Sequence, residues 1–372
     1  MKILFINHAG VWGGSSVSMM QLANALKNRG DSVSFLNTTK PEDTCKRLEK
    51  DGFSVQRVPW VMSNPYYNGG VTNLLSPSFW SSMRHVCKTK KIIENCIKNS
   101  DCDLVIANSL TLFYTGAIAK KYGKKAICLQ RETLPDTLYA SHIRKQMAAH
   151  FDGLVFISAY DMHFFDKSDI FKTVLYDKVD FDLYDKQEGF LNSDNPKKIL
   201  FLGGINRLKG TLTALKALKE TENCKLLIVS SKTFEEAQAQ SYAKTCLMYI
   251  RKHGLADKIE IVPPTQQVEQ LYAACDTVLF SPTKAHQTRL IYEACAARKP
   301  IVVPDYDNLK EFMYGHVFAY RKDDPKSCAD ALRNAMAGEI DFDKAYAACK
   351  AKHNATDLEA EMQAIFDEVN KL

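Results

Sequence analysis

Residues 276–303 read DTVLFSPTKAHQTRLIYEACAARKPIVV and contain two short apolar runs separated by a helix-length segment. The runs 278–280 and 301–303 are rich in residues that favour strands. Between them, Thr288 is placed to cap a helix over 289–298, and a proline ends that helix. This order predicts an open α/β sheet whose ligand meets the loop and the helix start at the carboxyl ends of the strands.

Strand-like apolar runs alternate with amphipathic helical segments twice along the chain. The expected strands are 3–7, 33–36, 55–58, 104–107, 126–129 and 154–157 in the first half, and 198–202, 226–229, 259–262, 278–280 and 301–303 in the second. Strands that alternate with helices predict parallel sheets with right-handed crossovers. We therefore expect an α/β protein with two Rossmann-like doubly wound domains facing across a cleft.

Length and local composition predict where these domains begin and end. A chain of 372 residues with 46% hydrophobic and 25% charged residues is globular and most simply forms two domains. The polar segment 180–196 has no sustained period and predicts a linker. We expect an N-terminal domain over 1–180 and a C-terminal domain over 181–354, with a final helix at about 355–372 packing back on the first.

Charge and cysteine usage exclude several classes of protein. The net charge of +6 is too small and too dispersed to indicate nucleic-acid binding, but it suits loose contact with an anionic membrane surface. The eleven cysteines include no Cys-x-x-Cys pair, which indicates reduced thiols in a cytosolic protein without a metal site. No signal peptide or membrane-spanning segment is expected from the apolar runs.

A glycine-bearing turn follows the first strand of the second half. Residues 203–210 read GGINRLKG, with Arg207 and Lys209 just before an expected helix. Glycines let a backbone approach a phosphate, and cations at a helix start favour an anion. The alternative is that Lys209 is a solvated lysine of the first helical turn.

Three segments together resemble the donor domain of retaining family-4 glycosyltransferases, also called glycosyl transferases group 1, of GT-B fold. They are 201–210 (FLGGINRLKG), 271–276 (LYAACD) and 293–303 (EACAARKPIVV). Gly13 and Gly14 match the glycine turn of the acceptor domain in this family. Residues 174–180 look like the strand that leads into the interdomain linker.

The resemblance assigns roles to individual residues. It implies that Glu293 binds the ribose hydroxyls of the donor nucleotide, whereas the alternative is a carboxylate on a helix surface. It implies that Lys209 binds the donor diphosphate. Arg207 is the candidate replacement for an arginine that usually follows the strand glycine, where this chain has Gly203 and Gly204.

The sequence departs from the family at one acid. The family usually has two glutamates separated by seven residues, and the first position holds Ala285 here. Either other groups hold the sugar, or the protein binds without transferring. His286, Gln287 and Thr288 are candidates to bind sugar hydroxyls, and Arg289 is a candidate to bind phosphate; ordinary loop polarity is the alternative for each.

The N-terminal half offers three further candidate segments. Gly13 and Gly14 open a helix that would meet the donor phosphate or the acceptor. Arg131 and Glu132 follow a strand where related enzymes contact the sugar or the acceptor, and a surface ion pair is the alternative. Residues 60–67 form an aromatic stretch suited to stacking on a sugar or a lipid interface, with a packed loop as the default.

The resemblance implies a glycosyltransferase that moves a sugar from a UDP- or GDP-sugar to a glycan or lipid-linked acceptor with retention of configuration. It implies surface polysaccharide or glycolipid synthesis in the cytoplasm, at the inner face of the membrane, with no permanently bound cofactor or metal. Two other classes compete: a catalytically silent GT-B subunit, which Ala285 favours, and a nucleotide-sugar epimerase of the same fold. The donor base, sugar, acceptor and oligomeric state stay open.

Overall fold

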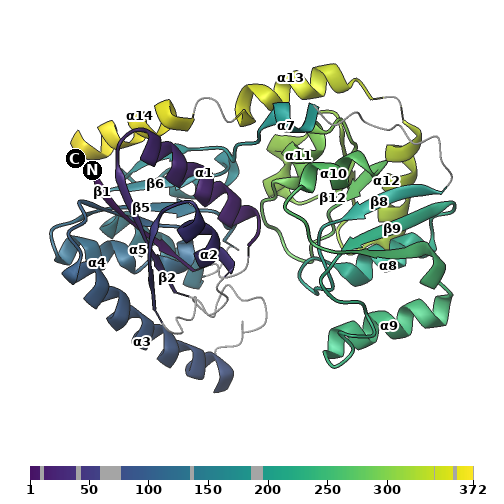
Figure 1. Cartoon of the computed structure of the whole chain (residues 1–372), viewed down its shortest axis with the longest axis horizontal. Helices are drawn as coiled ribbons and strands as arrows, with labels where there is room; N and C mark the ends of the chain where they lie inside the picture. The colour runs from purple at the N-terminus through teal and green to yellow at the C-terminus, as the bar shows by residue number, and fades with distance from the viewer. Residues whose placement is uncertain are drawn as a thin grey trace. The chain divides into compact units, whose positions relative to one another are not determined.

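The chain forms two compact units in a computed structural model (Figure 1). The first unit comprises Met1–Lys178 and Thr356–Leu372, and the second comprises Val179–Ala355. The structure describes residues 1–8, 12–38, 43–58, 77–134, 138–185, 196–338, 340–354 and 358–371, without the side chains of residues 78, 79, 82, 83 and 139.

The first unit contains an open, seven-stranded parallel sheet in the order β3-β2-β1-β4-β5-β6-β7. Its strands are β1 (Lys2–Asn7), β2 (Ser32–Asn37), β3 (Ser54–Arg57), β4 (Leu104–Ala107), β5 (Lys125–Gln130), β6 (Gly153–Phe156) and β7 (Phe171–Val174). Its helices are α1 (Gly14–Asn28), α2 (Asp43–Lys50), α3 (Pro77–Asn99), η1 (Leu110–Leu112), α4 (Thr115–Lys121), α5 (Leu138–His150), α6 (Ala159–Met162), η2 (His163–Phe165) and α14 (Leu358–Lys371).

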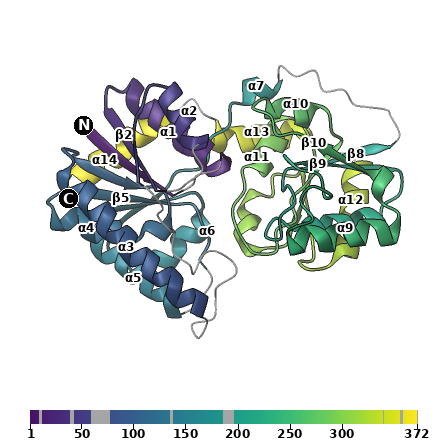
Figure 2. The same ribbon diagram turned by 60° about the horizontal axis from the view of Figure 1, so that its bottom comes forward.

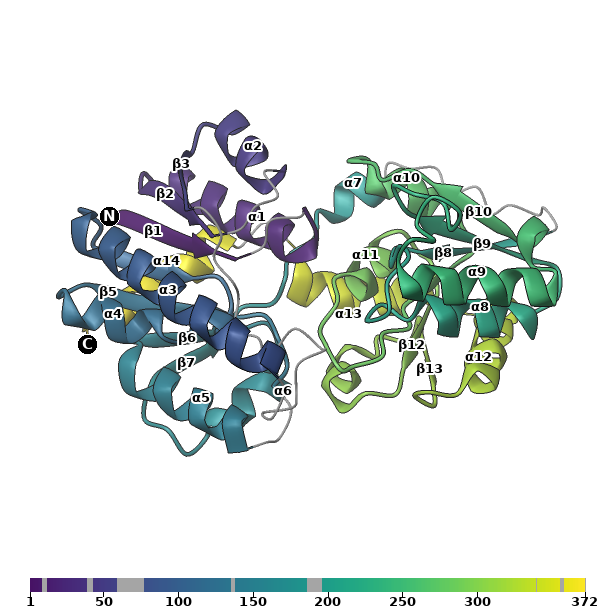
Figure 3. The same cartoon turned by 90° about the horizontal axis from the view of Figure 1, so that it is seen from below.

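Helices cover both faces of this sheet, and successive side chains of β1 pack alternately against the helices of one face and of the other. Ile3 and Phe5 pack into a core shared with α1 and α14, two helices that lie side by side (Figure 2). Leu4 and Ile6 point the other way, into a core shared with α3, α4 and α5 (Figure 3). Burial on both faces explains why β4 reads as a continuous apolar run.

The second unit contains an open, six-stranded parallel sheet in the order β10-β9-β8-β11-β12-β13. Its strands are β8 (Lys197–Phe201), β9 (Cys224–Val229), β10 (Ile259–Val262), β11 (Thr277–Leu279), β12 (Ile301–Pro304) and β13 (Val317–Tyr320). Its helices are α7 (Phe181–Asp185), α8 (Thr211–Lys219), α9 (Ser241–His253), η3 (Ala256–Lys258), α10 (Val268–Ala273), α11 (Leu290–Ala296), η4 (Asp307–Phe312), α12 (Pro325–Ala337) and α13 (Phe342–His353). A buried core joins β8 to α8, α9 and α12.

The two parallel α/β sheets confirm the predicted fold class, and several element boundaries differ from the expectation. The last strand of the first unit is Phe171–Val174, so the expected strand 174–180 is wrong. Part of the expected linker, Phe181–Asp185, is helical because Phe181 and Tyr184 are buried. Residues 186–195 of that linker lie outside the described residues.

No helix in the described ranges is both long enough and apolar enough to cross a membrane. The cysteines are free thiols, and nine of the eleven are buried. Within the same ranges, no cluster of histidine, cysteine and acidic side chains is arranged to hold a metal ion.

Candidate functional site

The second sheet brings the loops after β8 and β11 together. The chain enters this sheet at β8, continues on one side to β9 and β10, and crosses to the other side at β11. In open α/β sheets, ligands bind where the strand order reverses, outside the carboxyl ends of the strands. The candidate site in the second unit is therefore built from residues 202–210 and 280–289.

The turn after β8 is held in one conformation by steric and hydrogen-bond constraints. Gly210 has φ +77°, and a Cβ atom there would lie 1.7 Å from the Ser281 carbonyl oxygen. A Cβ on Gly203, which precedes Gly204, would lie 2.9 Å from the Lys209 Cβ. The Asn206 side-chain oxygen accepts a hydrogen bond from the Leu208 backbone N–H at 2.8 Å. Any other residue at Gly210 would therefore displace the turn from the loop after β11.

Hydrogen bonds tie this turn to the loop after β11. The Thr283 N–H donates to the Leu208 carbonyl at 3.0 Å, and the Ser281 hydroxyl donates to the Gly210 carbonyl at 3.2 Å. These contacts join segments more than 70 residues apart and fix the distance between Lys209 and the second loop.

Lys209 and His286 meet across the two loops. The Lys209 ammonium lies 3.0 Å from His286 Nε2. Lys209 is exposed as a residue, but burial around its ammonium lowers its pKa. Burial and the Lys209 charge lower the pKa of His286 to about 3, so the imidazole is neutral and accepts the hydrogen bond. Among the described residues, no carboxylate pairs with Lys209.

Glu293 lies on α11 and is held by two protein groups. Its Oε1 accepts a hydrogen bond from Arg289 Nε at 3.2 Å, and its Oε2 accepts one from the Tyr272 hydroxyl at 2.8 Å. The side chain of Glu293 is 14% exposed and that of Arg289 is 8% exposed. Tyr272 is fully buried, and its ring packs edge-on against the Tyr184 ring with centroids 5.6 Å apart. Glu293 is therefore a fixed, nearly buried carboxylate and not a mobile surface group.

The other predicted residues of the second unit have identifiable contacts. The Arg207 guanidinium lies over the Tyr242 ring, 5.5 Å from its centroid. The Gln287 side-chain amide donates to the Asn308 carbonyl at 3.0 Å. The Thr288 hydroxyl accepts from the Leu290 N–H at 3.2 Å, although α11 begins at Leu290 and ends at Ala296, inside the expected helix 289–298.

In the first unit, Arg131 belongs to a buried polar network at the carboxyl edge of the sheet. Arg131 Nε donates to Asn108 Oδ1 at 2.7 Å, and its NH1 lies 3.1 Å from Asp177 Oδ1. The Asn108 amide donates to Asn7, and the Asn7 amide donates to Asn37. The Arg131–Asp177 pair is nearly buried, so the surface ion pair considered from the sequence is wrong.

Glu132 is buried beside this network. Its carboxylate accepts hydrogen bonds from the Ser109 hydroxyl at 2.6 Å and from the Leu110 N–H at 3.1 Å. Burial raises the pKa of Glu132, and these hydrogen bonds oppose the shift. His8 Nε2 lies 4.0 Å from Glu132 Oε1, and burial lowers the pKa of His8 to about 4. A carboxyl group with a raised pKa and an imidazole with a lowered pKa thus lie close together, one after β5 and the other after β1.

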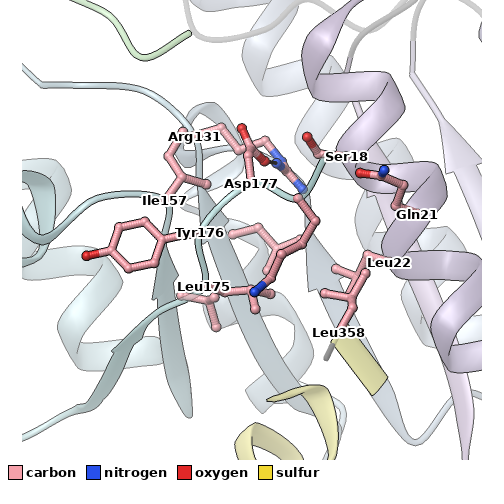
Figure 4. Close-up of a pocket in the computed structure, with 12 residues that line it drawn as sticks. Ser18, Gln21, Leu22, Arg131, Ile157, Leu175, Tyr176, Asp177 and Leu358 are labelled. Atoms are coloured by element: carbon pink, nitrogen blue, oxygen red, sulfur yellow. Dashed lines mark hydrogen bonds and ion pairs between the residues drawn. The ribbon is translucent and has the colours of Figure 1, made fainter. Parts of the chain in front are cut away.

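Gly13 and Gly14 form the start of α1. Gly13 is extended, with φ −165°, and a Cβ atom there would meet no described atom within 4 Å. A separate pocket in the first unit lies between α1, α14 and the segment 175–178. Arg131 lines this pocket and faces Asp177 (Figure 4). The aromatic stretch 60–67 lies outside the described residues.

Several residues of these sites were not identified from the sequence. Asn7, Asn37 and Asn108 each lie at the end of an apolar strand, and this shared position is a signal that sequence analysis can use. Tyr272 gave no such signal, because its contact with Glu293 joins residues 21 positions apart.

Residues 184–353 match the Glycosyl transferases group 1 family. No curated protein sequence is similar enough to the chain to match it. Among solved structures, the Anabaena protein HepE in complex with UDP and glucose has 17% identity and a TM-score of 0.74, over 99% of each chain. A glycosyltransferase from Rickettsia africae has 18% identity and a TM-score of 0.74, over 100% of this chain and 98% of that one.

Sucrose-phosphate synthase from Thermosynechococcus elongatus has 13% identity and a TM-score of 0.73, over 100% of this chain and 99% of that one. Similarity at these identities establishes the fold. The chain therefore has the GT-B fold of two Rossmann-like sheets, and residues 184–353 are similar to the Glycosyl transferases group 1 family.

Proposed function

We propose that the protein is a glycosyltransferase that takes a sugar from a nucleotide-diphosphate sugar. The observation that carries this proposal is the pair of loops at the switch point of the second sheet. There, Lys209 has no carboxylate partner among the described residues, and Glu293 is a fixed carboxylate. The matched family and the complexes of HepE with UDP and UDP-glucose support it. The donor is a UDP- or GDP-sugar that comes and goes as a substrate.

The two side chains suit the two polar parts of such a donor. The Lys209 ammonium would bind the diphosphate, and Arg207 is the second cation of the same turn. Glu293 uses one lone pair on each oxygen for Tyr272 and Arg289, which leaves lone pairs to accept hydrogen bonds from the ribose hydroxyls. His286, Gln287, Thr288 and Arg289 are the remaining donor-site candidates.

The transfer that we propose retains the anomeric configuration, as the family resemblance implies, and needs no dedicated base. The bond from the anomeric carbon to the diphosphate breaks, and a bond to the acceptor oxygen forms on the same face. The acceptor proton goes to an oxygen of the departing diphosphate, whose charge Lys209 stabilises. An NMR assignment of the anomeric configuration in donor and product tests retention directly, and an inverted product would contradict it.

The first unit would hold the acceptor, a glycan or a lipid-linked saccharide. Gly13 and Gly14 stand at the start of α1, and no described atom lies within 4 Å of a Cβ added at Gly13. Arg131 and Glu132 lie at the carboxyl edge of the sheet. We assign Arg131 to fixing this edge, since Asp177 already neutralises it. Glu132 is the candidate to contact the acceptor or the transferred sugar.

The competing function is a silent subunit that binds nucleotide sugar without transferring it, and Ala285 favours that function. The test is donor consumption by the wild type, Ala285→Glu and the uncharged control Ala285→Gln, with a panel of UDP- and GDP-sugars. Wild-type consumption of one donor supports the enzyme. Nucleotide binding with consumption only by Ala285→Glu establishes the silent subunit.

We also assign the membrane contact expected of surface polysaccharide or glycolipid synthesis to α3. This helix has five lysines and arginines against one glutamate. Arg84, Lys88 and Lys91 are exposed along one side, and Trp80 at the beginning of the helix is 62% exposed. An exposed tryptophan beside basic residues suits an anionic bilayer surface.

Vesicles of phosphatidylglycerol and phosphatidylcholine should therefore sediment the protein, whereas vesicles of phosphatidylcholine alone should not. Lys88→Glu with Lys91→Glu should abolish sedimentation. Equal sedimentation of this variant and the wild type would exclude α3 as the contact.

A further inference from the structure

His286 has its hydrogen-bonding state determined by its neighbours. The Lys209 ammonium has only protons to offer, so Nε2 at 3.0 Å must carry a lone pair. Nδ1 then carries the proton and donates to the Lys284 carbonyl at 3.3 Å. The imidazole is therefore neutral, in one tautomer, with both nitrogens engaged by the protein.

The ring is also fixed in orientation. Phe280 packs against His286 edge-on, with ring centroids 5.0 Å apart. The loop that carries His286 is anchored to the turn that carries Lys209 through the Thr283–Leu208 hydrogen bond. The acceptor nitrogen thus lies at a defined place beside the ammonium.

We propose that His286 is a positioning residue that holds the Lys209 ammonium where the donor diphosphate binds, and that it does not contact the transferred sugar. This inference rests on the proposed function. A carboxylate at the same place would cancel the charge of the ammonium, as Glu293 does for Arg289. A neutral acceptor restricts the lysine rotamers and leaves the positive charge available to an anion.

With His286 in this role, the donor site needs no acid at position 285, where this chain has Ala285. The residue next to Ala285 provides a hydrogen-bond acceptor for the lysine without adding negative charge next to the diphosphate. It also reassigns His286, which the sequence suggested as a contact for sugar hydroxyls.

Calorimetric titration of three ligands into the full-length protein distinguishes positioning of Lys209 from contact with the sugar. The ligands are uridine, UDP and UDP-glucose. His286→Leu removes the acceptor and keeps an apolar contact with Phe280, so it should weaken UDP and UDP-glucose equally, by about tenfold, and leave uridine unchanged. His286→Gln can place an amide oxygen near the ammonium and should recover most of the affinity. GDP or ADP with its nucleoside replaces these ligands if the wild type prefers it.

A loss confined to UDP-glucose would show that His286 contacts the sugar and would overturn the inference. Equal loss of uridine affinity would show a general collapse of the pocket and would overturn it too. In a double-mutant cycle, His286→Leu should cost no further UDP affinity once Lys209→Ala is present. A wild type that binds none of UDP, GDP and ADP contradicts the proposed function itself, which separates that failure from failure of the inference.

Discussion

The cations at the carboxyl edges of the two sheets have different kinds of partner. In the first unit, the Arg131 guanidinium is neutralised by Asp177 at 3.1 Å, and both side chains are nearly buried. In the second unit, the Lys209 ammonium faces a neutral imidazole. A cation that is already paired stabilises the edge, whereas an uncompensated one is available to an anionic ligand. This difference supports our proposal that the donor diphosphate binds at the second edge.

The largest effect should come from substituting the glycine turn of the second unit. Gly210→Ala should lower the free energy of unfolding by about 4 kcal/mol, because of the positive φ and the 1.7 Å approach to Ser281. Gly13→Ala is the matched control in the other unit and should change it by about 0.5 kcal/mol or less, since no described atom lies within 4 Å of its Cβ. Urea denaturation measures both. Equal effects would show that the first turn is packed as tightly as the second.

Removing one cation from each edge sharpens the comparison. Arg131→Ala leaves Asp177 nearly buried without its cation and should destabilise the protein by about 3 kcal/mol. Lys209→Ala should cost about 0.5 kcal/mol or less of stability, since no carboxylate among the described residues depends on it, and should weaken UDP binding. A reversal of the two stability effects would contradict the assignment of these residues.

Glu293→Gln tests the carboxylate of the second edge. It should weaken UDP binding by about 2 kcal/mol, because a charge-assisted contact with the ribose is lost. The same change should leave the affinity for 2′,3′-dideoxy-UDP as it is in the wild type, since that ligand lacks both hydroxyls. Calorimetric titration of both ligands gives the answer. A parallel loss for the two ligands would mean that Glu293 acts only through Arg289 and Tyr272.

The smallest effect concerns a feature that the two edges share, a neutral histidine. The pKa of His8 is lowered to about 4 and that of His286 to about 3, in both cases mainly by burial. Unfolded histidines bind protons near pH 6.5, so stability falls as the pH drops from 6.5 towards these folded-state values.

Between pH 7 and pH 5, each histidine should remove about 1.8 kcal/mol from the free energy of unfolding. His8→Gln and His286→Gln should each reduce that pH dependence in urea denaturation. A pH dependence unchanged in both variants would show that the folded protein protonates these rings normally.

The central strands could be predicted because parallel strands covered on both faces are apolar throughout, as β4 and β12 are. The edge strands β7 and β13 were not predicted. Their side chains are mostly half-buried, so the apolar run that marks a central strand is absent. Helix α7 was not predicted because its two buried aromatic residues lie in a segment that is otherwise polar, which indicated a linker.

The residue types of the candidate site could be predicted from the sequence, but the pairs of side chains that contact each other could not. The glycine turn and Glu293 follow from local pattern and family resemblance. The partner of Lys209 is 77 residues away and that of Arg131 is 46 residues away, and only the folded sheet brings them together. Arg131 and Lys209 are both cations after a strand. The sequence alone does not show that Arg131 pairs with a carboxylate whereas Lys209 pairs with none in the part of the chain that the structure describes.

The most direct test of the account is a crystal structure of the protein soaked with UDP, GDP or ADP. We predict that one nucleoside diphosphate binds to the second unit, with its phosphates on Lys209 and its ribose hydroxyls on Glu293. A nucleotide bound elsewhere, with Lys209 and Glu293 making no contact to it, would contradict the central claim.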